Sequence, residues 1–131
     1  MRSSARRSLA TAFVVASAVA AAACGGGSSG LDTSDLTVEQ RLGLEVAQHQ
    51  GCASCHGSTF GGGVGPTWHG LAGSQVTLED GTTVVADSAY LTESIAAPSA
   101  KVVQGSTIAM PRNDLTDAEI AQVVAYIEAL G

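Results

Sequence analysis

Two cysteines and a histidine within five positions place the strongest constraint on what this chain can fold into. The segment GCASCHG holds Cys52, Cys55 and His56. Because residues three and four apart share a face of a helical turn, the three side chains are expected to project in one direction from one turn. Such a cluster can form a redox disulfide, half of a zinc site, or the attachment site of a larger group.

A redox disulfide and structural zinc both require sequence features that the surrounding chain does not offer. A thioredoxin-like Cys-x-x-Cys follows a strand in a βαβ unit, whereas the apolar residues before the cluster recur every four positions, as in a helix. Structural zinc needs about four ligands, typically with a second pair. The other candidates, His49, His69 and Cys24, are poorly spaced for that purpose.

Cys-x-x-Cys-His is also the attachment sequence of c-type haem, and His56 completes it. We therefore predict one covalently attached haem c, with thioether bonds from Cys52 and Cys55 and the His56 imidazole on the iron. The composition agrees, because a haem would supply apolar bulk that residues 24–131 lack. Their only aromatic residues are Phe60, Trp68, Tyr90 and Tyr126.

A six-coordinate haem needs a second axial ligand, and a Met/His pair raises the reduction potential. The sequence has two methionines, of which Met1 lies in the N-terminal leader, so Met110 is the sulfur candidate. A loop methionine otherwise fills a gap in the core. The rivals are His49, on the helix just before the attachment site, and His69, which is expected to be a solvated surface residue.

The N-terminus is predicted to be an export signal. Three arginines within residues 2–7 precede an uncharged apolar run, 9–23, which is shorter than the ~20 residues that span a bilayer. A transmembrane helix is the weaker alternative. Small residues follow this run, and then the segment CGGGSSG, which begins with Cys24. This order resembles a bacterial lipoprotein signal, although Ala21 stands where that pattern usually has leucine. The resemblance implies cleavage before Cys24 and lipid attached to it; the alternative is ordinary cleavage that leaves a spare thiol.

Cleavage after residue 23 would leave a strongly acidic protein. The three arginines of the leader are lost, and the remaining chain keeps three basic residues (Arg41, Lys101 and Arg112) and all twelve acidic residues. Its net charge is therefore −9. Such a surface disfavours nucleic acid and anionic lipid headgroups. A basic patch on another protein is the better partner.

Periodicity and turn signals predict a mostly helical fold with long loops. Capping-box pairs start helices at Thr37 and Thr116. A shorter helix is expected over residues 90–97, after Asp87 or Ser88 and stopped by Pro98. Asp80-Gly81 predicts a hairpin with a two-residue turn. The fold class is therefore all-α, with short helices, one small β-hairpin insertion, and functional loops.

Residues 37–131 resemble class I cytochromes c. The matching segments are GCASCHG, GPTWHGLAG, MP and LTDAEIAQVVAYIEAL. We accordingly divide the chain into a signal peptide (1–23), a lipidated cysteine with a flexible linker (24–36) and a cytochrome c domain (37–131). Within the family, VTLEDGTTVVADSAYLTESIAAPSAKVVQG is similar to the cytochrome c domain of subunit II of some bacterial haem–copper oxidases, although the copper-binding domain of that subunit is absent from the sequence.

The resemblance implies further contacts with the haem and its ligands. Pro66 would offer its carbonyl to the far ring nitrogen of His56, and Tyr90 would lie on the methionine side. Trp68 and Leu71 would pack near the haem, Trp68 in place of the usual leucine. The first and last helices would cross with Gly43 against the Tyr126 side. Ser74 stands where some relatives carry a propionate-binding arginine.

These features predict an electron carrier rather than an enzyme: a membrane-tethered one-electron carrier of a respiratory chain. It would act on the outer face of the bacterial cytoplasmic membrane or in the periplasm, exchange electrons with redox proteins such as a terminal oxidase, and bind no nucleic acid. Two alternatives stay open. One is a catalytic or gas-sensing haem with a labile Met110 ligand, and the other is a cytochrome subunit of a larger oxidase or dehydrogenase complex.

Overall fold

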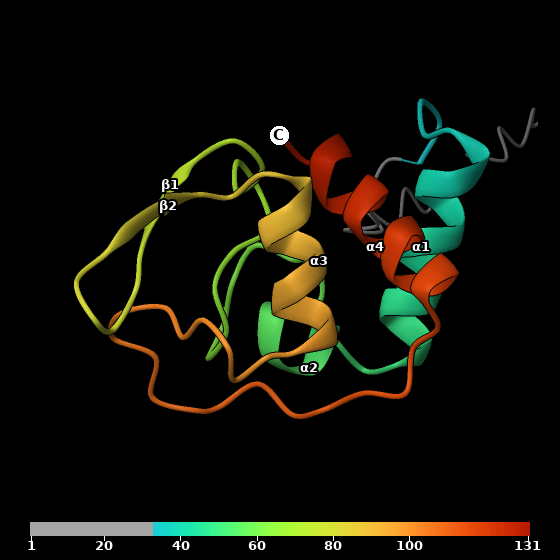
Figure 1. Cartoon of the computed structure of the whole chain (residues 1–131). Helices are drawn as coiled ribbons and strands as arrows, with labels where there is room; N and C mark the ends of the chain where they lie inside the picture. Colours follow the sequence, from blue (N-terminus) through green and yellow to red (C-terminus); the bar gives the residue numbers. More distant parts are fainter. Residues whose placement is uncertain (1–32) are drawn as a thin grey trace, which may run out of the picture.

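The computed structural model describes residues 33–131, which form four helices and one two-stranded antiparallel sheet (Figure 1). In chain order these are α1 (Val38–His49), α2 (Ala53–His56), β1 (Gln75–Thr77), β2 (Thr83–Val85), α3 (Ser88–Ala96) and α4 (Asp117–Ala129). Helices α1 and α4 pack against each other, α3 packs on α4, and the hairpin lies on the far side of α3. The predicted helical fold with a small hairpin is confirmed.

Both long helices begin where their capping boxes predict. The Thr37 hydroxyl accepts from the Gln40 N–H while the Gln40 side chain accepts from the Thr37 N–H, and Thr116 and Glu119 repeat the arrangement. Each box satisfies backbone donors that a helix start otherwise leaves without partners. The hydrogen bonds from Thr116 also lower the pKa of the Glu119 carboxyl.

The crossing of α1 and α4 depends on a glycine. A Cβ atom built on Gly43 would lie 1.9 Å from the carbonyl oxygen of Gln122 and 3.0 Å from the Cβ of Tyr126. The two backbones therefore approach more closely than any side chain at position 43 would allow. The predicted placement of Gly43 against the Tyr126 side is confirmed.

The hairpin forms at the predicted place, but the prediction of a two-residue turn is wrong. Strands β1 and β2 pair Gln75 with Val85, and the last backbone contact before the turn runs from the Leu78 N–H to the Thr82 carbonyl (2.8 Å). Residues 79–81 therefore form a three-residue loop, with Gly81 at φ 83°. A type I turn followed by a residue at positive φ is the usual form of such a loop.

Helix α3 begins at Ser88, two residues before the predicted start, because Asp87 caps it by accepting from the Tyr90 N–H (2.8 Å). It ends before Pro98, as predicted. A long connection then runs along the lower side of Figure 1 to α4. A backbone bridge between Leu78 and Val103 joins the first part of this connection to the hairpin.

The predicted signal peptide, Cys24 and most of the linker fall within residues 1–32 and lie outside the described residues. Among the helices of residues 33–131, none has both the length and the hydropathy to cross a bilayer.

Candidate functional site

The cysteine–histidine cluster forms one helical turn, as its spacing predicts. Cys52 has helical backbone angles (φ −55°, ψ −37°) directly before α2, and its carbonyl accepts from the N–H groups of Cys55 (3.2 Å) and His56 (3.0 Å). The turn follows helix α1 and not a strand, which is the context expected for an anchor and not for a thioredoxin-like disulfide.

The two cysteines are half-buried and not joined to each other. Burial raises the pKa of the Cys52 thiol, and repulsion from Cys55 adds to the shift.

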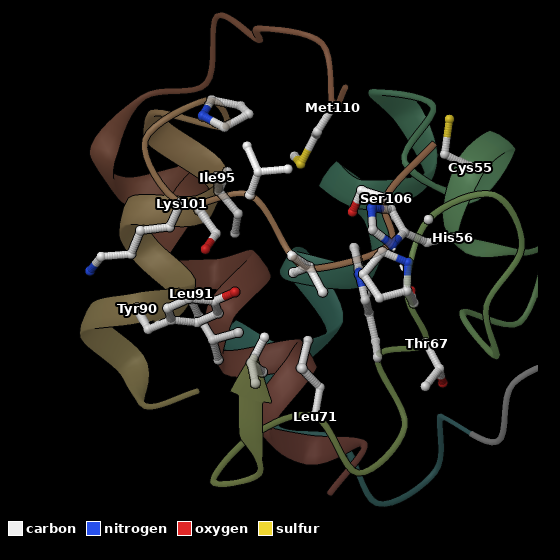
Figure 2. Close-up of a pocket in the computed structure, with 18 of the residues that line it drawn as sticks. Cys55, His56, Thr67, Leu71, Tyr90, Leu91, Ile95, Lys101, Ser106 and Met110 are labelled. Carbon is white, nitrogen blue, oxygen red and sulfur yellow. Dashed lines mark hydrogen bonds between the residues drawn. The ribbon is translucent and has the colours of Figure 1, made fainter. Parts of the chain in front are cut away.

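A cavity of about 510 Å³ opens beside this turn. Figure 2 shows His56 and the thioether of Met110 pointing into it, with Tyr90, Leu91 and Leu71 across from them. The lining is mostly apolar, and of the lining residues in the described part of the chain only Lys101 carries a full charge. The apolar lining residues include Trp68, Leu71, Val76, Tyr90, Leu91, Ile95, Ile108, Met110 and Ile127.

The His56 ring is held on several sides. Its Nδ1 lies 2.8 Å from the Pro66 carbonyl oxygen, the contact that the family resemblance implies. Because a carbonyl accepts, this contact places the proton on Nδ1 and leaves the lone pair on Nε2. A Cβ on Gly65 would lie 3.0 Å from the ring, so only glycine lets the backbone come this close. His56 is 8% exposed.

The structure brings the other predicted site residues to the same cavity. Trp68, Leu71, Tyr90 and Met110 all line it. Trp68 and Tyr90 are buried, whereas Met110 is 37% exposed at the cavity wall.

Both rival histidines are exposed, and only one of them lines the cavity. His49 is exposed at the end of α1 and does not belong to the cavity lining. His69 is exposed, as predicted, and it also lines the cavity, with its ring Nε2 2.8 Å from the Thr59 carbonyl oxygen.

The segment that carries Met110 is held at its ends only. Within the described residues, no hydrogen bond involves positions 107–112. On one side the Ser106 N–H donates to the Val103 carbonyl (3.1 Å), and on the other the Asn113 side chain donates to the Ile95 carbonyl at the end of α3 (2.8 Å). Asn113 was not predicted from the sequence, and no local pattern marks it.

Two more residues of the site were missed. Phe60 is fully buried and has a positive φ of 58°, which is uncommon for a bulky residue. It is the one aromatic residue of the glycine-rich segment 57–65 after His56, and that isolation was a usable signal. Ser94 lines the cavity with a buried hydroxyl that has no partner among the described residues, and nothing in the sequence indicated it.

The residues fit a covalently bound haem. Cys55 and His56 line the cavity, and Cys52 stands on the same turn without lining it. The cavity has the apolar lining and the volume of a cofactor site, for which about 300–1,000 Å³ is typical. The hydrogen bond from Nδ1 to the Pro66 carbonyl leaves the Nε2 lone pair of His56 free to bind a metal.

A comparison with protein families matches residues 41–131 to the family described as cytochrome c. The match covers well over half of the chain, and the chain belongs to the cytochrome c family. Within this family the spacing of Cys52, Cys55 and His56 indicates covalent haem c, and the chain is a haem electron-transfer protein. Members are typically electron carriers rather than enzymes. A comparison with curated proteins gave no match.

Proposed function

We propose that this protein is a membrane-tethered carrier of single electrons in which His56 and Met110 are the two axial ligands. The observation that carries the proposal is the single cavity beside the Cys52–Cys55 turn, into which the His56 ring and the Met110 thioether both point (Figure 2). A haem with both axial positions filled has no site for a substrate, which suits a carrier.

When bound, the haem supplies a one-electron iron couple, and the protein's own residues set the conditions for it. The Pro66 carbonyl fixes the tautomer of His56 and increases its basicity as a ligand. Buried Trp68, Tyr90 and Leu91 exclude water from the cavity. A thioether ligand and an apolar surrounding both favour the ferrous state and raise the potential.

Met110→Ala tests the axial pair. Removing the thioether is expected to abolish the far-red sulfur-to-iron absorption band of the oxidised protein and to lower the midpoint potential, because the sulfur ligand favours ferrous iron. Ile108→Ala, two positions away on the same exposed segment, is the matched control and should keep the band. Persistence of the band in Met110→Ala would show that Met110 is not the ligand.

The tether is supported by the order of features in residues 1–30, an apolar run and then a cysteine and glycines. Several acyl chains on Cys24 would hold the protein on a bilayer, at about 0.8 kcal/mol per buried methylene group. Placement on the outer face of the cytoplasmic membrane or in the periplasm agrees with c-type haem, which is attached outside the cytoplasm.

Intact-mass measurement of the exported protein tests this tether and the haem together. We expect a chain that begins at Cys24 and carries one haem and acyl groups. Cys24→Ala should move the protein to the soluble fraction with its haem retained. An unmodified Cys24 in the membrane-purified protein would disprove the lipid anchor and leave the haem assignment unaffected.

The partner is proposed to be a redox protein with a basic docking face, because the chain from residue 24 onward carries a net charge of −9. The resemblance of residues 76–105 to the cytochrome domain of oxidase subunit II supports a terminal oxidase as the acceptor. Weak, brief docking is typical of such carriers.

Ionic strength tests the role of this charge. Reduction by a cationic metal complex is expected to slow by several-fold as salt rises from about 0.01 to 0.5 M, because screening shortens the range of attraction from about 30 Å to a few ångströms. Reduction by an anionic complex should speed up over the same range. Equal salt responses for the two reagents would contradict steering by the acidic surface.

A labile-ligand haem is a second candidate, favoured by one observation. Met110 is 37% exposed, on the six-residue segment 107–112 that makes no hydrogen bonds to the described residues. A catalytic or gas-sensing protein would exploit such a ligand. Rapid carbon monoxide binding to the reduced wild type, or a high-spin oxidised spectrum, would favour this candidate over the carrier.

A further inference from the structure

Trp68 lines the cavity and contacts both the His56 ring and the buried aromatic residues Phe60 and Tyr126. Its indole is 4% exposed and stacks on Phe60, with ring centroids 4.3 Å apart and planes 12° apart. It meets Tyr126 edge-on at 6.3 Å, and Tyr126 in turn meets Phe60 edge-on at 5.5 Å. On its other side the indole lies 5.1 Å from the His56 ring, tilted by 43°.

We propose that Trp68 is a positioning residue that fixes the plane of the His56 imidazole and keeps water from its Nδ1–Pro66 hydrogen bond. The inference rests on the proposed role of His56 as an iron ligand. It assigns to Trp68 an action on the ligand itself, which is distinct from lining the haem cavity.

One hydrogen bond does not fix the plane of the His56 ring. The Pro66 carbonyl restrains the position of Nδ1, and the ring can still turn about that contact. The Gly65 backbone lies against the His56 ring, so closely that a Cβ atom built on Gly65 would be 3.0 Å from the nearest ring atoms. Trp68 supplies a second surface, and two surfaces with one polar contact leave a single orientation.

Trp68 is itself held in place by its backbone and by its ring contacts. The Trp68 backbone N–H donates to the Phe60 carbonyl (2.9 Å), and the Trp68 backbone carbonyl accepts from the Leu71 N–H (3.2 Å). Aromatic pairs in offset and edge-on geometries add stabilisation beyond the area that they bury. The stack with Phe60 and Tyr126 therefore joins the imidazole to the α1–α4 crossing, so that the ligand's orientation is set by the rigid part of the fold.

A leucine at position 68 would lose these contacts. It is shorter and cannot stack on Phe60, so space would open beside the His56 ring and water would reach the Nδ1 proton. In the reduced holo-protein, Trp68→Leu is expected to accelerate exchange of the His56 Nδ1 proton with solvent by about tenfold or more, since local opening becomes easier. The low-spin ferric g-values should also shift, because they report the plane of the axial imidazole.

Two variants separate positioning from general stability. Trp68→Phe retains an aromatic ring and should stay close to the wild type in both measurements. Val123→Ala removes a buried core side chain on α4 that does not line the cavity, and it should lower the unfolding midpoint without changing the g-values or the Nδ1 exchange. Should Trp68→Leu yield no holo-protein, Phe60→Leu tests the same idea, because it removes the surface on which the indole stacks.

Unchanged exchange and g-values in Trp68→Leu would overturn the inference, and so would an equal acceleration in Val123→Ala. Failure of the proposed axial ligation would look different. In that case the wild type itself would lack the low-spin spectrum of a histidine-ligated haem.

Discussion

Replacing both Cys52 and Cys55 by serine is expected to give a colourless chain that does not reach the native fold. The cavity beside the turn measures about 510 Å³. At about 24 cal/mol per Å³, leaving it empty would cost up to ~12 kcal/mol. That cost is comparable to the whole stability of a typical domain, about 5–15 kcal/mol. Far-ultraviolet circular dichroism and covalent haem on a denaturing gel measure the result.

Ser54→Ala is the matched control, because Ser54 lies on the same turn between the two cysteines and is exposed. It should retain covalent haem and a native spectrum. A double-serine variant that is colourless and yet folds with a cooperative transition would contradict the view that the haem is part of the core.

Gly43→Ala is expected to cause the second-largest loss, with the haem still attached. Its Cβ would lie 1.9 Å from the Gln122 carbonyl oxygen, so α1 and α4 must move apart. Overpacking of this kind costs about 1–3 kcal/mol or more, which outweighs the gain of up to about 1 kcal/mol from placing alanine in a helix. Thermal unfolding of the holo-protein should shift down by about 10 °C.

Glu45→Ala, on the exposed face of the same helix, controls for helix propensity and should be close to neutral. A Gly43→Ala variant as stable as the wild type would mean that the helices can separate without cost. The close crossing would then not be what holds the fold together.

Features set by neighbours along the chain could be predicted from the sequence. The capping boxes at Thr37 and Thr116 were found because each needs only two residues three positions apart. The turn of Cys52, Cys55 and His56 was found for the same reason. The hairpin turn was misjudged because Asp80-Gly81 fits both a two-residue and a three-residue loop. The hydrogen bonds of Leu78 with Thr82 and Gly81 are what distinguish them.

Contacts between distant segments could not be derived from spacing. Met110 was reached by elimination and Pro66 through family resemblance, although the structure places both at the cavity. Asn113 escaped notice because its partner, the Ile95 carbonyl, is 18 positions away. The role of Phe60 was not predicted because it depends on the stacking of Phe60 on Trp68.

The sequence by itself determined the chemistry of this protein: an anchor for one haem, made from residues close enough to share a turn. The tertiary structure decided how that anchor is surrounded. Packing of α1 on α4 through Gly43 positions the aromatic stack that ends at His56, and the long connection brings Met110 to the same cavity. The physical reason is that hydrogen bonds within a turn are fixed by local spacing, whereas ring packing and cavity walls exist only after distant segments meet.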